Sequence, residues 1–123
     1  NLMIERFRNI EFFLIHPERR KELNFGPFNR IRILERAQLG NVTISYKPVK
    51  ETEGNINICG YLNPGVKMIN KKVPSSRYSC FLISDSQFVL PAFDHYPEMN
   101  YYHPGNSYKL YCIKGNRIKK LKN

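Results

Sequence analysis

The chain has 123 residues, of which 41% are hydrophobic, as is typical of one globular domain with a modest core. Its 20 Lys and Arg residues against 10 Asp and Glu residues give a formal net charge of +10, which favours nucleic acid, or a complex that contains it, as a partner. No apolar run approaches about 18 residues, so no membrane-spanning helix is predicted. Because the first residue is Asn1 rather than Met, we interpret the chain as one domain of a longer polypeptide.

The first quarter of the sequence predicts helix. Apolar residues recur three and four positions apart from Leu2 to Leu14, as on one side of an amphipathic helix. His16-Pro17 should end this helix, since the residue before a proline avoids helical geometry. A short second helix is predicted from Glu18 to Leu23, so residues 1–23 form an N-terminal helical segment.

The middle of the chain alternates apolar and polar side chains, the pattern of β-strands. The first strand is predicted from Arg30 to Gln38, and Gly40-Asn41 is interpreted as the point where it bends before alternation resumes at Val42. Shorter strands are predicted near residues 56–62 and 66–69, within an insertion that spans about residues 41–76.

The last third of the chain predicts two hairpins. Apolar segments flank the polar patch Ser84-Asp85-Ser86, as in two strands that are joined by a tight turn. After a polar crossing over residues 94–106, a strand from Ser107 to Ile113 is followed by a turn at Gly115-Asn116 and a last strand from Arg117 to Leu121. This order is typical of the back half of an OB barrel. We therefore predict a mainly β fold, a five-stranded OB-type Greek-key barrel over residues 30–121, preceded by an N-terminal helix.

Motifs for catalysis and for metal binding are missing from the sequence. The seven glycines are scattered rather than grouped in a phosphate-binding loop, and neither a nucleophile elbow nor an HExxH motif occurs. Cys59, Cys80 and Cys112 lie far apart without a CxxC pair, so we interpret them as reduced structural thiols, with Cys80 and Cys112 buried in strands. The sequence therefore predicts no enzyme, no catalytic or metal-binding residue, and no cofactor.

Basic and aromatic residues near the C-terminus leave two interpretations open. OB folds bind single strands with aromatic side chains in a basic groove, and the residues that would form such a site are Tyr101, Tyr102, Lys114, Arg117, Lys119 and Lys120. Alternatively, the tyrosines belong to the core and the basic residues form a solvated strand edge. Adjacent residues of an extended segment point to opposite sides, so one of Tyr101 and Tyr102 should be exposed.

The hairpin from Cys80 to Ala92 resembles the OB domain of the shelterin telomerase-recruitment protein family, the telomere end-binding protein β subunit family, which includes a ciliate telomerase counterpart. Ile31 to Gln38 is similar to that family's first strand, and Ser107 to Leu121 to its fourth and fifth. The resemblance implies a nuclear, telomeric accessory domain that binds the telomerase catalytic subunit and supports telomere repeat synthesis and processivity. Other telomere or telomerase OB-fold proteins are implied as partners, with single-stranded telomeric DNA or RNA nearby and no membrane.

The resemblance also implies where the telomerase subunit would bind. In the family, an acidic patch after the third strand carries much of the contact, and its match is Asp94 and Glu98. The residues proposed for partner binding are Asp94, Glu98, Tyr96, Phe93 and Glu35. Independently of the family, the sequence from Tyr78 to Tyr108 contains neither Lys nor Arg. Telomerase recruitment and single-strand binding therefore remain the two alternatives.

Overall fold

The computed structural model describes residues 6–16, 31–70, 73–93 and 98–122. Within these residues every regular element is a β-strand, so the predicted mainly β class is confirmed. The strands are β1 (Phe12–Ile15), β2 (Ile31–Leu34), β3 (Arg36–Leu39), β4 (Val42–Ser45), β5 (Ile56–Cys59), β6 (Pro64–Asn70), β7 (Val73–Ile83), β8 (Gln87–Val89), β9 (Asn100–Tyr101), β10 (Lys109–Lys114) and β11 (Arg117–Lys120).

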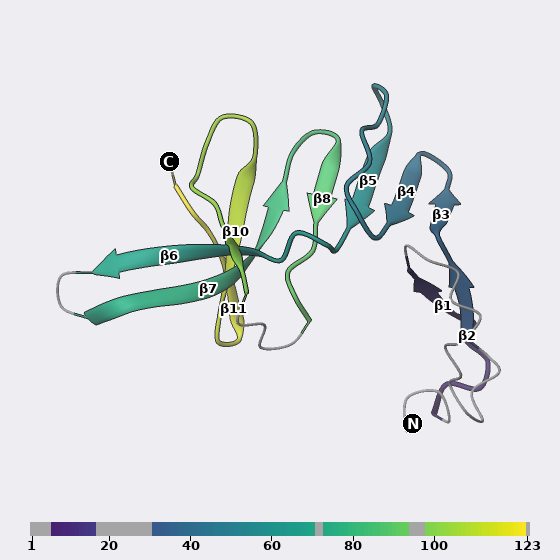
Figure 1. Ribbon diagram of the computed structural model, residues 1–123, viewed down its shortest axis with the longest axis horizontal. Helices are drawn as coiled ribbons and strands as arrows, with labels where there is room; N and C mark the ends of the chain where they lie inside the picture. Colours follow the sequence, from purple (N-terminus) through teal and green to yellow (C-terminus); the bar gives the residue numbers. More distant parts are fainter. Residues whose placement is uncertain (1–5, 17–30, 71–72, 94–97, 123) are drawn as a thin grey trace.

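One large mixed sheet carries most of these strands. Its path runs β11-β10-β7-β8-β5-β4-β3, and β6 pairs with the first half of the long strand β7 (Figure 1). β9 pairs with β6. β4, β5 and β8 are parallel neighbours, whereas β3–β4, β7–β8, β7–β10 and β10–β11 are antiparallel. β1 and β2 form a separate parallel pair. The path has two free ends, so the described sheets are not closed and do not establish a five-stranded OB barrel.

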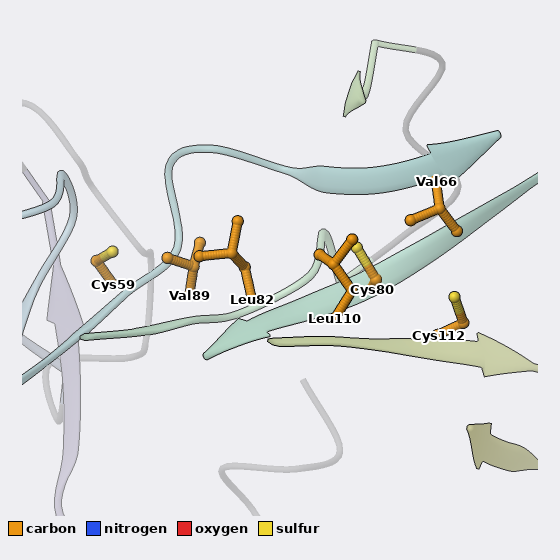
Figure 2. Close-up of a cluster of buried hydrophobic side chains, with 7 residues drawn as sticks. All are labelled: Cys59, Val66, Cys80, Leu82, Val89, Leu110 and Cys112. Carbon is orange, nitrogen blue, oxygen red and sulfur yellow. The ribbon is translucent and has the colours of Figure 1, made fainter. Parts of the chain in front are cut away.

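The core lies on one face of the large sheet. Leu82 faces both Val89 and Leu110 across the sheet, and Cys80 faces Cys112, so alternate residues of neighbouring strands meet on the same side. Figure 2 shows these side chains in one cluster, whose members are at most 6% exposed: Cys59, Val66, Cys80, Leu82, Val89, Leu110 and Cys112. The prediction that Cys80 and Cys112 are buried, reduced residues of strands is confirmed.

Both C-terminal hairpins are confirmed. β7 and β8 pair through Leu82–Val89 and Ile83–Phe88, and the Ser84 backbone N–H donates to the Gln87 carbonyl at 2.8 Å across the predicted turn. β10 and β11 pair around Gly115, whose φ of 59° lies in the left-handed region that the turn needs.

The predicted N-terminal helix is wrong where the structure describes its end. Phe12–Ile15 forms β1, which pairs in parallel with β2 from Phe12–Ile31 to Ile15–Leu34. Aromatic and β-branched residues favour strands, and pairing with a distant segment overrides a helical spacing of apolar positions. Residues 17–23, the predicted second helix, lie outside the described residues.

The predicted first strand is two strands. β2 ends at Leu34 and β3 begins at Arg36, so Glu35 interrupts the expected run. Gly40, with a φ of 60°, lies in the turn of an antiparallel hairpin that pairs Leu39 with Val42, and is not a bend within one strand. The reason is local: a two-residue turn that begins with a left-handed residue returns the chain on itself.

Candidate nucleic-acid interface

The ends of three parallel strands meet at one edge of the large sheet. β4 ends at Ser45, β5 at Cys59 and β8 at Val89, and Figure 1 shows their arrowheads on the same side. The residues that follow β4 and β5 are therefore neighbours in space although they are about 15 positions apart in the chain. Open sheets with parallel strands commonly bind ligands outside these carboxyl ends.

Aromatic side chains gather at this edge. The ring of Tyr46, which follows β4, meets the ring of Tyr61, which follows β5, edge to face at 5.2 Å between centroids. The His16 ring stacks on Tyr46 at 6.2 Å, and the Lys47 Nζ lies 4.9 Å from the centre of the Tyr61 ring. Tyr46 is 38% exposed and Tyr61 44% exposed, so part of each ring surface remains accessible to a ligand. We call these four residues the aromatic edge.

Backbone hydrogen bonds fix the two tyrosines relative to each other. The Tyr46 carbonyl accepts from the Gly60 N–H at 3.3 Å and from the Tyr61 N–H at 3.0 Å. The Leu90 N–H donates to the Cys59 carbonyl at 2.8 Å, which ties the end of β8 to the end of β5. These backbone hydrogen bonds fix the aromatic edge to the sheet. Less conformational entropy is therefore lost when a ligand binds there.

A buried asparagine supports the same edge from inside the sheet. The fully buried Asn57 donates through Nδ2 to Ser45 Oγ at 2.9 Å and to the Thr43 carbonyl at 3.3 Å. Its Oδ1 accepts from the Val49 N–H at 3.0 Å and from Gln87 Nε2 at 3.3 Å.

Ser45 connects Asn57 to the segment that follows β4. Its Oγ donates to the Lys47 carbonyl at 2.6 Å, while accepting from Asn57. The segment from Tyr46 to Val49 is therefore held at both ends by a network centred on one side chain. A satisfied buried network of this kind defines the position of what it holds.

The aromatic edge offers ring faces for stacking and an ammonium group for an anion. Tyrosine faces stack on nucleobases, and a lysine beside them attracts phosphate. A hollow of about 280 Å³ adjoins it, lined by Glu35, Arg36, Ser45, Tyr46, Lys47 and Val49. Among the described residues, no three His, Cys, Asp or Glu side chains are grouped so that they could hold a metal ion.

The residues predicted for nucleic-acid binding are divided between several places. Tyr101 is 40% exposed with the Arg77 guanidinium 5.9 Å from its ring centre, whereas Tyr102 packs against the core and meets Tyr108 edge to face at 5.9 Å. The expectation that one of the two tyrosines is exposed is confirmed. Burial, followed by the neighbouring Tyr108, raises the pKa of Tyr102.

The basic residues of the last hairpin point to both faces of the sheet. Lys114 faces Arg117 and lies with its Nζ 5.1 Å from the Tyr78 ring centre, and Lys119 faces Cys112 on the core side. Lys120 faces Tyr111 on the opposite side. There it lines a groove of about 480 Å³, whose lining residues are Gly105, Asn106, Lys109, Lys120, Leu121 and Lys122. Lys114, Arg117 and Lys119 therefore lie on one side of the sheet and Lys120 on the other.

The residues predicted for partner binding are also separated. Phe93 and Glu98 are exposed, on either side of a stretch that includes Asp94 and Tyr96, both of which lie outside the described residues. Glu35 lies elsewhere, in the hollow beside Tyr46. The predicted acidic patch thus stays a prediction, and Glu35 is placed with the aromatic edge.

The thiols show the effect of burial on titration. Burial raises the pKa of Cys59 from 9.0 to about 11 and that of Cys80 to about 12, with Cys112 adding to the shift at Cys80. The pKa of Cys112 is also raised by burial, and Lys114 opposes the shift. Three protonated, buried thiols are poor nucleophiles, which agrees with structural roles.

The sequence interpretation missed Tyr46, Lys47, Tyr61 and His16. The position of the two tyrosines could have indicated the site. Each tyrosine comes just after a strand, and these strands, residues 42–45 and 56–59, are parallel neighbours in the sheet. Within the described residues no helix is long and apolar enough to cross a membrane.

Comparisons with known proteins bear on the fold. No protein-family model matches the chain, and no curated protein matches it. Among solved structures, a nuclease called MPE from Pseudomonas putida is similar with a TM-score of 0.72 and 20% sequence identity. The match covers 95% of this chain and 57% of the nuclease chain, so the chain spans little more than half the length of that protein. At this identity the likeness establishes a shared fold.

Proposed function

We propose that this chain binds single-stranded nucleic acid and that the aromatic edge is the binding site. The observation that carries the proposal is the fixed pair of exposed tyrosines, with Lys47 over one ring, at the carboxyl ends of three parallel strands. Bases of any sequence stack on such rings, while the ammonium group is placed for the phosphate between them. Unpaired bases are required, because a duplex hides their faces.

Two further observations support nucleic acid as the ligand. The net charge of +10 attracts a polyanion over the whole surface. The fold is shared with a protein that is a nuclease. We propose binding for the described part of the chain, because the exposed rings and the lysine of its aromatic edge are groups that hold bases and phosphate.

Removing the two rings should weaken binding more than removing an equally exposed ring elsewhere. Stacking contributes about 1–3 kcal/mol per base, so Tyr46→Ala and Tyr61→Ala should each raise the Kd for a fluorescent single-stranded oligonucleotide about fivefold or more in anisotropy titrations. Tyr101→Ala is the matched control, since Tyr101 is exposed to a similar degree and also lies near a cation. Equal Kd values for all three variants would refute the assignment, provided that thermal melting shows each of them folded.

The salt dependence distinguishes the aromatic edge from the basic hairpin. Lys47→Glu should flatten the plot of log K against log salt by roughly 0.7 for one lost phosphate contact. If the aromatic edge is the site, reversal of Lys119, Lys120 and Lys122 to Glu should leave the effect of Tyr61→Ala on Kd intact. If the basic hairpin is the site, the triple reversal abolishes binding and Tyr61→Ala has no effect.

Recruitment of telomerase, the function implied by the resemblance, stays a separate proposal. Its residues Asp94 and Glu98 would contact a basic face of the telomerase catalytic subunit, and charge at such a rim steers association. Asp94→Lys combined with Glu98→Lys should reduce co-purification with that subunit about tenfold, whereas Glu51→Lys with Glu53→Lys should not. Equal recovery with both double variants would argue against this proposal.

A further inference from the structure

β6 and β7 form a two-stranded arm that leaves the large sheet on the side of the aromatic edge. β7 pairs with β10 and β8 only from Cys80 onward, whereas its earlier residues pair with β6. Because β7 is antiparallel to β8 and Leu82 faces Val89, the residues that precede Leu82 extend past the carboxyl end of β8. Figure 1 shows the two strands leaving the sheet together. We call residues 66–70 and 73–78 the arm.

The aromatic edge continues directly into this arm. Only Leu62 and Asn63 separate Tyr61 from Pro64, the first residue of β6. Both residues of this link are fixed by Asn100, whose Nδ2 donates to the Leu62 carbonyl at 2.7 Å and whose backbone N–H donates to the Asn63 carbonyl at 3.1 Å. The Tyr61 ring and the base of the arm are therefore parts of one continuous, hydrogen-bonded segment.

The arm carries positive charge on one side. Lys67 and Arg77 are register partners in the antiparallel pair β6–β7, and both side chains are exposed. Like charges that face each other across two strands destabilise the pairing. Every charged residue from Gly54 to Ser84 is Lys or Arg, so this part of the sequence supplies no carboxylate to offset them. An anion bound between the two cations removes this repulsion.

Tyr101 holds one of these cations in place. In the register of β9 with β6, Tyr101 faces Gly65, two residues before Lys67, so it belongs to the side of the arm that carries the cations. The Arg77 guanidinium lies 5.9 Å from the centre of the Tyr101 ring. A guanidinium that stacks on a ring keeps N–H donors at its rim, and its planar fork matches the oxygens of a phosphate. Because Arg77 lies over this ring, we assign to Tyr101 the positioning of Arg77 and not the stacking of a base.

We propose that Lys67 and Arg77 bind the phosphate backbone of the same single strand whose bases stack on Tyr46 and Tyr61. The inference rests on the proposed function and extends its site along the arm. At about 3.3 Å per residue, the chain from Tyr61 to Lys67 spans at most about 20 Å. A strand that rises roughly 3.4 Å per nucleotide covers that distance in about six nucleotides. The complete site therefore takes a longer strand than the aromatic edge alone.

Oligonucleotide length separates the two contacts. In anisotropy titrations of the complete protein with oligo(dT), a strand of about four nucleotides occupies the aromatic edge, whereas a strand of about 12 also reaches the arm. Lys67→Glu should raise the Kd for the longer strand about tenfold and flatten its plot of log K against log salt by roughly 0.7. The Kd for the shorter strand should not change. The Tyr101→Ala control for the aromatic edge belongs with the shorter strand, which does not reach Arg77.

The stability of the variant distinguishes binding from a structural role. Lys67→Glu places opposite charges across the arm, so its Tm should equal or exceed that of the wild type while its affinity for the longer strand falls. Lys119→Glu is the matched control, because it changes the net charge equally on an exposed residue of β11, on the core side of the sheet. It should leave the ratio of the two Kd values unchanged. All titrations are made at a temperature where melting curves show the variants folded.

The outcomes for the arm and for the aromatic edge are distinct. Equal Kd values of Lys67→Glu and Lys119→Glu for the longer strand, or an equal loss of Lys67→Glu with both strands, would overturn the contact at the arm. The aromatic edge would stand in that case if Tyr61→Ala still raises the Kd for the shorter strand. If Tyr61→Ala changes the Kd of neither strand, the proposed function is refuted and the extension along the arm with it.

Discussion

Asn57 offers the most direct test of how the sheet positions the aromatic edge. Its side chain is fully buried and makes four hydrogen bonds, to Ser45, Thr43, Val49 and Gln87. Asn57→Ala removes all four and leaves the half-buried Val49 N–H without its acceptor.

The size of the effect follows from these bonds. A hydrogen bond contributes about 1 kcal/mol net, and a buried group left unsatisfied costs about 1–3 kcal/mol. Because the four bonds share one side chain and do not add fully, we expect the free energy of unfolding to fall by about 3 kcal/mol. For a chain of this length that lowers Tm by about 12 °C.

The control for Asn57 lies two residues earlier in the same segment. Asn55 makes one exposed side-chain bond, from Nδ2 to Thr52 Oγ1 at 2.7 Å, so Asn55→Ala should cost less than about 1 kcal/mol. Urea titrations followed by circular dichroism measure both variants. If Asn57→Ala is no more destabilising than Asn55→Ala, the buried network does not hold the sheet together. If it is destabilising but single-strand affinity at a temperature where it is folded is unchanged, the network does not position the aromatic edge.

Two further predictions concern the core and a close contact. Burial raises the pKa of Cys59 to about 11 and that of Cys80 to about 12. The folded chain therefore keeps two thiol protons that the unfolded chain loses near pH 9. As a result, the free energy of unfolding should be constant below about pH 8 and should fall between about pH 9 and pH 12. Urea midpoints at pH 7 and pH 10.5 should therefore differ less in the Cys59→Ala, Cys80→Ala double variant, and an unchanged difference would contradict the assignment to these thiols. Gly65→Ala would place a methyl group 3.0 Å from Met99 Cβ and 3.3 Å from the Tyr78 carbonyl, so we expect a loss of about 1–3 kcal/mol, while Gly60→Ala, with nothing within 4 Å, should cost less. Equal Tm values for the two glycine variants would show that Met99 moves aside freely.

Local pattern was sufficient for the C-terminal hairpins and for part of the core. Ser84-Asp85-Ser86 between two apolar segments predicted the β7–β8 hairpin, and Gly115 predicted the turn between β10 and β11. Alternation predicted that Cys80 and Cys112 are buried. In these cases the partners are close in the chain, so the turn residues themselves determine which residues pair.

Local sequence patterns could not predict which distant segments pair. Phe12–Ile15 has a helical spacing of apolar residues with its upstream neighbours but forms a strand, because pairing with Ile31–Leu34 decides its conformation. β4, β5 and β8 are parallel neighbours that come from different hairpins. No turn sequence connects them directly, so no turn motif could indicate this pairing. Consequently the sequence pointed to Tyr101 and Lys120, and it missed Tyr46 and Tyr61, which the pairing of β4 with β5 brings into contact.

The sequence by itself determined the mainly β class, the basic charge, the two late hairpins and the burial of Cys80 and Cys112. These properties follow from composition and from the two-residue period of a strand, which each segment carries alone. Only the tertiary structure decided that Tyr46 and Tyr61 form one edge and that Lys119 and Lys120 belong to opposite faces of the sheet. The reason is that strand order and register depend on the free energy of contacts between distant segments, which no local pattern records.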